Sequence, residues 1–496
     1  MRHESQDMDY EPLKRRGKNE PQAEEDFDAG FPVDPFARKK ELPSREQEIF
    51  KAPAPANNGV IQKPTTQNAI LKRGHALSFA GLYLFVALVY LRPYEWSPSL
   101  MFLSTSTFWV AAMTLLIFVL TQLGLENKLT ARPREVNLVL LLGLAGLLAV
   151  PLALDRLVAW NALLDYWKVI LMFIVMVNVV RTERRLRALI WLALISSVVV
   201  SVSAVNDYRT GNLLLGLNER IEGTLGNLFQ NPNDLALFLN TMIPIAFAML
   251  LGKRALTKKL LYLALVLLFV AGVVCTTSRG GFIGLGCVVT VFAWKMTKKY
   301  RIFVGGLALA MILGLGVFGP GGLTTRLMKG SDDASTVTRK DDLKRSLFLM
   351  ARHPLFGLGM NNYIFYSNSA HATHNAYTQI GAEMGIPALI VYILFLVTPL
   401  RRLSKIRRNW DEADDRKHLR YLCLGIETAI VGYMVTSFFL SVAYLWYAYF
   451  LVGYAVTLRR LISPAEFESA PSLHRQPSER SLNSSDTPVM ARDANW

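Results

Sequence analysis

The amino-acid sequence predicts an all-α integral membrane protein with about 12 transmembrane helices. The chain has 496 residues, of which 52% are hydrophobic, and its mean hydropathy is +0.28. Runs of about 18 or more apolar residues recur along it, and a helix needs about 20 to cross the hydrocarbon core of a bilayer. Most basic residues lie in the short connectors between these runs, as is typical of polytopic membrane proteins.

The apolar runs lie between two polar ends. Residues 1–70 contain 11 Lys and Arg and 13 Asp and Glu without a sustained apolar period, and residues 464–496 are similarly polar. We expect both ends to be disordered tails that flank one transmembrane domain at 71–463. The N-terminus has no apolar core, so we expect no cleavable signal peptide. The predicted spans lie near 74–91, 103–123, 136–153, 167–180, 186–205, 233–251, 257–275, 280–297, 301–319, 376–400, 421–440 and 442–458.

The connectors predict how the helices are oriented. One set holds 23 Lys and Arg within about fifty residues, and consists of 124–135, 181–187, 252–259, 295–301 and 401–420. The other set holds 13 within more than a hundred residues, and consists of 92–99, 154–168, 206–232, 276–280 and 320–375. The two sets alternate along the chain. The positive-inside bias therefore places the first set and both tails in the cytoplasm, and the second set on the outward face.

The net charge of +16 does not indicate nucleic-acid binding. The basic residues are spread among membrane connectors instead of forming one stripe, so membrane lipids are the expected partners. Cys275, Cys287 and Cys423 lie in or beside apolar segments, without a CxxC pair or a Cys/His cage. Neither a disulfide framework nor a zinc site is predicted.

The first long outward connector contains a candidate anion-binding residue. It ends in the residues NPND, Asn231 to Asp234, which are suited to cap the helix that follows. Arg220 precedes them, on the face where basic residues are scarce and close to a helix N-terminus, which favours anions. The capping residues by themselves are equally consistent with an ordinary helix start.

A second candidate lies in the short connector SRGG, residues 278–281. One explanation makes its glycines a tight turn and Arg279 an interfacial anchor. The connector is so short, however, that Arg279 must lie at or just under the membrane surface, where an unpaired charge is costly. This position favours an anionic partner.

The second long outward connector predicts an external helix followed by a glycine-rich turn. The stretch RKDDLKRSLFLMARHP has a helical period with Leu343, Leu347 and Met350 on one side. The stretch HPLFGLGMNNY follows, and its glycines suit turns or close backbone approach. Glu383 lies nine residues beyond His374, and we expect it to be a buried structural carboxylate that does not contact that histidine.

Two histidines, His371 and His374, stand at the mouth of the span near 376–400. Two ligands are too few for zinc, and no acidic pair stands nearby to hold Mg²⁺ or Mn²⁺. A neutral histidine near pH 7 is better suited to accept a proton from a hydroxyl. Outward arginines can grip a diphosphate and offset its growing charge as it leaves. A diphosphate that carries a polyprenyl chain would be held at the membrane surface, with the chain between the helices. Lipid-linked sugar donors are built in this way.

The motifs RIEGTLGNLFQNPNDLA, SRGG, RHPLFGLGMNNY and HNAYTQIGAEMGIPAL, in this order, resemble the O-antigen ligase and O-antigen polymerase superfamily. The resemblance covers roughly residues 76–460. It implies a bacterial inner-membrane glycosyltransferase of the type-C membrane fold, with its active site in the periplasm. The implied reaction is inverting and needs no metal or other cofactor. The implied donor is a glycan on undecaprenyl diphosphate, and the acceptor is lipid A core, a growing glycan or another hydroxyl.

The resemblance also implies roles for individual residues. Arg220 and Arg279 match the arginines that hold the donor diphosphate, and Arg339 matches a third, with Lys344 and Arg345 as neighbouring competitors. His374 matches the catalytic histidine, and the adjacent Asn375 is placed with the substrate-binding residues.

A second class of function remains open at this stage. A transporter or flippase could use the same outward cations to bind an anionic or lipid-linked glycan without chemistry. Transporters often contain internal repeats and polar residues at mid-membrane, whereas this chain shows no repeat and gathers its polar residues on one face. The motifs do not separate ligases, polymerases and protein O-glycosyltransferases.

Overall fold

The computed structural model describes residues 75–95, 98–127, 129–211, 213–214, 220–221, 231–296, 305, 334–367, 372–410 and 416–463. These residues lie in one compact unit, Lys63–Trp496. The predicted tails, most of the predicted span at 301–319 and the side chains of Arg220 and His371 lie outside the described part, so the domain boundaries at 71 and 463 stay predictions.

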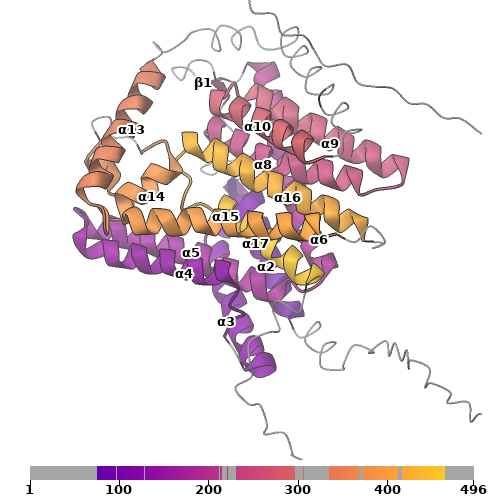
Figure 1. Ribbon diagram of the computed structural model, residues 1–496, viewed down its shortest axis with the longest axis horizontal. Helices are drawn as coiled ribbons and strands as arrows, with labels where there is room; N and C mark the ends of the chain where they lie inside the picture. The colour runs from indigo at the N-terminus through magenta and orange to yellow at the C-terminus, as the bar shows by residue number, and fades with distance from the viewer. Residues whose placement is uncertain are drawn as a thin grey trace, which may run out of the picture. The chain divides into compact units, whose positions relative to one another are not determined.

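The described part is helical apart from one short ribbon (Figure 1). Leu213–Leu214 (β1) pairs antiparallel with Arg220–Ile221 (β2). Short 3₁₀ turns include η4 (Tyr363–Phe365) and η5 (Ser437–Phe439). The α-helices are α2 (Ala76–Leu91), α3 (Ser106–Glu126), α4 (Arg134–Ala149), α5 (Arg156–Val179), α6 (Glu183–Thr210), α8 (Pro232–Leu251), α9 (Leu256–Cys275), α10 (Arg279–Lys295), α13 (Ala334–Arg352), α14 (Ala376–Met384), α15 (Ile386–Arg408), α16 (Lys417–Thr436) and α17 (Trp446–Ile462).

The prediction of a polytopic membrane protein is confirmed. Within the described residues, eight helical segments are long and apolar enough to cross a membrane. The shorter helices α2, α10 and α17 account for three further predicted spans, so the total of twelve stays a prediction. The eight segments are Ser99–Glu126, Arg134–Leu152, Arg156–Val179, Glu183–Thr210, Pro232–Leu251, Leu256–Cys275, Ile386–Arg408 and Lys417–Phe439.

Small residues let the central helices pack closely. A Cβ atom added at Gly425 of α16 would lie 2.5 Å from the Cβ atom of Ala248 on α8, and one added at Gly432 would lie 2.6 Å from a methyl group of Val288 on α10. Helices in lipid associate by van der Waals packing, so such close crossings stabilise the bundle. They fix α8, α10 and α16 side by side (Figure 1).

The predicted span at 376–400 is wrong as one continuous helix. It is two helices, α14 and α15, separated at Gly385, which has φ +90°. A Cβ atom there would lie 2.3 Å from the carbonyl oxygen of Leu355, and the N–H of Ile386 donates to the carbonyl of Pro354 at 2.7 Å. The break exists because the glycine-rich turn inserts its backbone against it.

The external helix is confirmed as α13, but its predicted apolar face is partly wrong. Leu347 is exposed, whereas Asp342 and Ser346 are buried. The buried polar groups have partners: the Tyr363 hydroxyl donates to the carbonyl of Asp342 at 2.9 Å, and the Ser367 hydroxyl donates to its carboxylate at 3.2 Å. Polar contacts with residues 363–367 therefore orient this helix. A helical period in the sequence cannot predict such contacts.

Candidate functional site

Helices α8, α10 and α14 begin at the same end of the bundle, which we call the site end. The predicted cap of α8 is confirmed, since the Asn231 side chain accepts from the N–H of Asn233 at 2.9 Å and Pro232 is the first helical residue. The Ser278 hydroxyl accepts from the N–H of Gly281 at 3.1 Å and donates to the side chain of Asn233 at 2.7 Å. One hydroxyl thus caps α10 and ties it to the start of α8.

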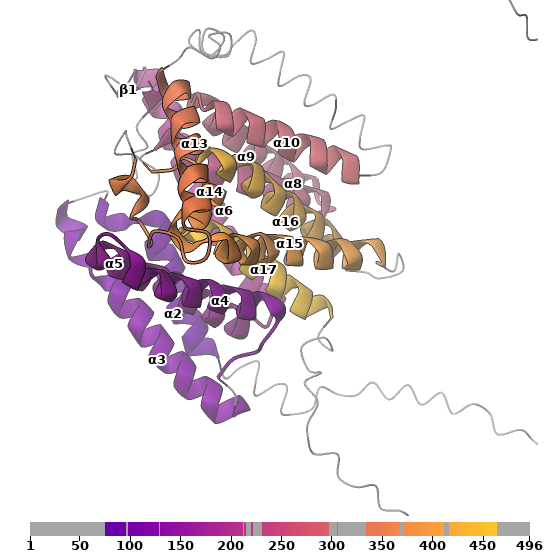
Figure 2. The same ribbon diagram turned by 60° about the vertical axis from the view of Figure 1, so that its left-hand side comes forward.

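Arg279 is the first residue of α10 and contacts the external helix α13. Its guanidinium donates to the Thr336 hydroxyl at 3.1 Å. Thr336 and Arg339 are three residues apart on α13 and therefore lie on adjoining positions of its surface. Figures 1 and 2 show α13 near the same end of the bundle as β1 and the start of α10. The contact brings the second and third candidate arginines to one junction.

His374 directly precedes α14 and has an unusual backbone. Its φ is +50°, in the left-handed region that costs a non-glycine residue ~1–3 kcal/mol. The neighbouring Asn375 is buried, and its side-chain oxygen accepts from the N–H groups of Tyr377 at 2.9 Å and Thr378 at 3.1 Å. Asn375 therefore caps α14 and, through this cap, holds His374 at the helix start.

The short helix η5 connects the neighbourhoods of His374 and Arg279. The Tyr377 ring packs against Phe438 with centroids 6.4 Å apart, and its hydroxyl donates to the carbonyl of Met434 at 2.7 Å. On the other side, a Cβ atom at Gly280 would lie 3.0 Å from the Cβ atom of Phe439. The starts of α14 and α10 therefore contact two adjacent phenylalanines of η5, Phe438 and Phe439 respectively.

Arg220 is placed only through its backbone. It pairs with Leu214 in the ribbon, and Figure 1 shows β1 near the top of α13. Its role stays a prediction.

A segment that the sequence did not single out fastens α14 in place. The Thr373 and Ser441 hydroxyls lie 3.0 Å apart, and the N–H of Ala443 donates to the Gln379 side chain at 3.2 Å. The Tyr444 hydroxyl donates to the Glu383 carboxylate at 2.7 Å. These contacts join residues more than sixty positions apart, so no local spacing in the sequence predicts them. The only sign of them in the sequence was the single carboxylate, Glu383, in an apolar run.

The glycine-rich turn completes this support. The N–H groups of Leu358 and Gly359 donate to the carbonyls of Ala382 and Glu383, both at 2.9 Å. Gly357 and Gly359 have φ of +69° and +88°, and a Cβ atom at Gly357 would lie 2.3 Å from the backbone of Glu383. The prediction that these glycines allow close backbone approach is confirmed.

Glu383 is the buried carboxyl at the centre of this support. Its side chain is only slightly exposed. The Tyr444 hydroxyl and the backbone N–H groups of Asn361 and Tyr363 donate hydrogen bonds to it. The expectation of a buried, hydrogen-bonded carboxyl is confirmed.

Within the described residues, no three His, Cys, Asp or Glu side chains form a group that could hold a metal ion. The absence of a metal from the reaction stays a prediction.

Residues 263–393 match the family model described as O-antigen ligase. This segment of the chain is similar to the O-antigen ligase family. The resemblance to the O-antigen ligase and polymerase superfamily is thereby confirmed, and this superfamily implies glycosyltransfer of the ligase or polymerase type in general. A search of curated proteins found no match to the chain.

The matched segment covers less than half of the chain but most of the candidate site. It contains Arg279, Arg339, His374 and Asn375. Arg220 and the supporting residue Tyr444 lie outside it, so the site end is completed by segments before and after the matched domain.

Proposed function

We propose that the protein transfers a glycan from an undecaprenyl-diphosphate donor to an acceptor hydroxyl at the periplasmic face of the bacterial inner membrane. The observation that carries this proposal is the hydrogen bond from Arg279 to α13, one helical turn from Arg339. The starts of α10 and α14, next to Arg279 and His374, both contact the short helix η5. The site thus combines cations for a leaving diphosphate with a residue that can accept a proton.

The acceptor oxygen would attack the anomeric carbon of the donor sugar from the face opposite the diphosphate. His374 would accept the hydroxyl proton as the new carbon–oxygen bond forms. The bond to the diphosphate would break with its electron pair, leaving undecaprenyl diphosphate. Arg220, Arg279 and Arg339 would stabilise the charge that develops on it. Attack from the opposite face inverts the anomeric configuration.

The position of Arg279 supports its assignment to the diphosphate. It is the first residue of α10, where backbone N–H groups already favour an anion. The Thr336 hydroxyl holds its guanidinium toward α13. A phosphate group at this junction would be bound by a helix N-terminus and by guanidinium groups from two helices.

We expect Arg279→Gln to lower kcat/KM for the donor by about 10- to 100-fold, because a hydrogen bond to a charged group is lost. Thr336→Val should have a smaller effect, since the charge remains. Arg352→Gln is the matched control, because Arg352 is an exposed arginine at the far end of α13. Equal losses in Arg279→Gln and Arg352→Gln would contradict a specific role.

The function is tested by incubating the purified full chain with undecaprenyl-diphosphate-linked oligosaccharide and alternative hydroxyl acceptors in the presence of a chelator. The expected result is a glycosylated acceptor whose new linkage has the opposite anomeric configuration to the donor. Movement of the donor across vesicle membranes without any product would instead indicate a flippase. Product with retained configuration would overturn the inverting mechanism.

A further inference from the structure

A basic pocket lies at the end of the bundle opposite the site end. It is formed where α6 begins, α8 ends and α16 begins, and it encloses a cavity of about 20 Å³. Arg187, Lys253 and His418 line it together with the apolar side chains of Ile190, Met249 and Leu422. A cavity of this size has room for about one water molecule, so a larger group would contact the charged side chains at its mouth.

Among the residues that the structure describes, the pocket gathers more positive than negative charge. Glu183 accepts from His418 at 2.7 Å and forms an ion pair with Arg187, so both contacts use the same carboxylate. Lys253 is partly buried, and its side-chain ammonium makes no hydrogen bond or ion pair with any residue that the structure describes. Its pKa is lowered by burial and then by the positive charges of Arg187 and Lys258, with Glu183 opposing them.

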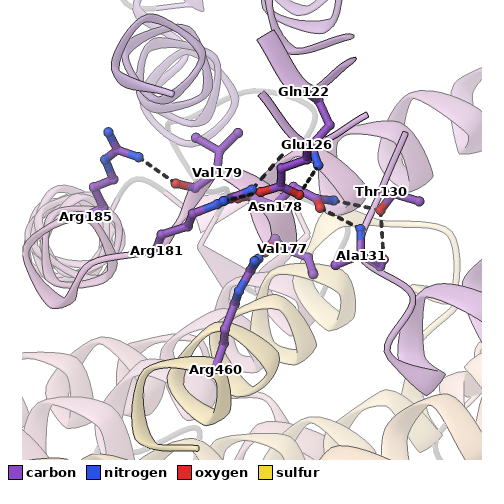
Figure 3. Close-up of polar contacts among 10 residues, drawn as sticks. All are labelled: Gln122, Glu126, Thr130, Ala131, Val177, Asn178, Val179, Arg181, Arg185 and Arg460. Carbon is purple, nitrogen blue, oxygen red and sulfur yellow. Dashed lines mark hydrogen bonds and ion pairs between the residues drawn. The ribbon is translucent and has the colours of Figure 1, made fainter. Parts of the chain in front are cut away.

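Three other arginines near this end of the bundle differ from Lys253 because they donate hydrogen bonds to backbone carbonyls. Figure 3 shows that Arg181, Arg185 and Arg460 donate to the carbonyls of Asn178, Val179 and Val177, at 2.6, 2.8 and 3.1 Å. These arginines satisfy carbonyl groups at the C-terminal end of α5, as cations commonly do there. Lys253 has no comparable acceptor in the described part of the chain.

The position of the pocket indicates which anion it would meet. It lies at the ends of three of the segments that can cross a membrane, so its charged side chains lie at the level of lipid headgroups. Its apolar lining residues Ile190, Met249 and Leu422 belong to these same segments. Basic pockets between transmembrane helices are known to suit the phosphate groups of anionic lipids.

We propose that Arg187, Lys253 and His418 form a binding site for the glycerophosphate headgroup of an anionic membrane phospholipid. The phosphate would lie between the Lys253 ammonium and the Arg187 guanidinium. The acyl chains would lie in the membrane beside these spans. This site is separate from the glycan-transfer site and does not depend on the proposed reaction.

Native mass spectrometry of the full chain in detergent, titrated with phosphatidylglycerol or phosphatidylcholine, tests the proposal. We expect tighter binding of phosphatidylglycerol, and we expect Lys253→Gln to weaken it about fivefold, as for one basic residue near an anionic headgroup. Arg254→Gln is the matched control, because it removes the same charge from the adjacent, exposed position. Lys253→Arg should bind as wild type does.

Several results would overturn the site. Equal affinity for the two lipids, or equal weakening by Lys253→Gln and Arg254→Gln, would show only diffuse surface attraction. Weakening by Lys253→Arg as large as that by Lys253→Gln would show that charge is not the cause. Displacement of phosphatidylglycerol by an equal concentration of glycerol 3-phosphate would indicate a soluble phosphate ester instead of a lipid.

Discussion

Replacing His374 with alanine is expected to lower turnover by ~10²–10⁴-fold, the loss typical of a missing general base. The protein should remain folded, because the neighbours of His374 supply contacts that hold the start of α14. Asn375 caps the helix, and Thr373 contacts Ser441. The measurement is the single-turnover rate with saturating lipid-linked donor, compared across a range of pH.

His374→Gly separates catalysis from backbone support. Because residue 374 has φ +50°, glycine adopts its conformation without the steric cost that histidine bears. This variant should be at least as stable as His374→Ala in thermal unfolding, yet as inactive. A binding-only protein would keep its activity in both variants at reduced affinity. Normal turnover by either variant would refute the assignment of His374 as general base.

The second large effect is expected at the buried ion pair between Arg459 of α17 and Glu135 of α4. The two side chains are 2% and 0% exposed, and two nitrogens of the guanidinium contact the two carboxylate oxygens at 2.7 and 3.2 Å. Arg459→Met leaves the carboxylate buried without its partner. We expect a loss of ~3–5 kcal/mol in the free energy of unfolding, measured by chemical denaturation in detergent.

The matched variant removes both charges. Arg459→Met combined with Glu135→Leu leaves no uncompensated buried group, and such replacements are often neutral or stabilising. The double variant should therefore recover most of the lost stability. If the double variant is no more stable than Arg459→Met alone, the loss comes from packing of the arginine side chain and not from the orphaned carboxylate.

Local patterns in the sequence were sufficient for several features of this protein. The apolar runs, the amphipathic period of α13 and the cap at Asn231 each depend on residues within a few positions of one another. The motif around Arg279 and the histidine before α14 could be recognised as candidate site residues for the same reason. The glycines at 357 and 359 also predicted a close approach of two backbone segments. They did not predict which segment lies against them.

Other features depend on contacts between residues far apart in the chain, and no pattern of spacing reports them. The break at Gly385 follows from the insertion of residues 354–359 against it. The polar face of α13 is buried because residues 363–367 supply its partners.

The membrane character and the candidate chemical groups were thus determined by the sequence alone, since hydropathy and residue type are local properties. Only the tertiary structure decided that Arg279 meets α13 and that Tyr444 supports Glu383. The pocket around Lys253 likewise became visible only in the tertiary structure. The physical reason is that hydrogen bonds and desolvation act on whichever groups the fold brings within a few ångströms, however distant they are in sequence.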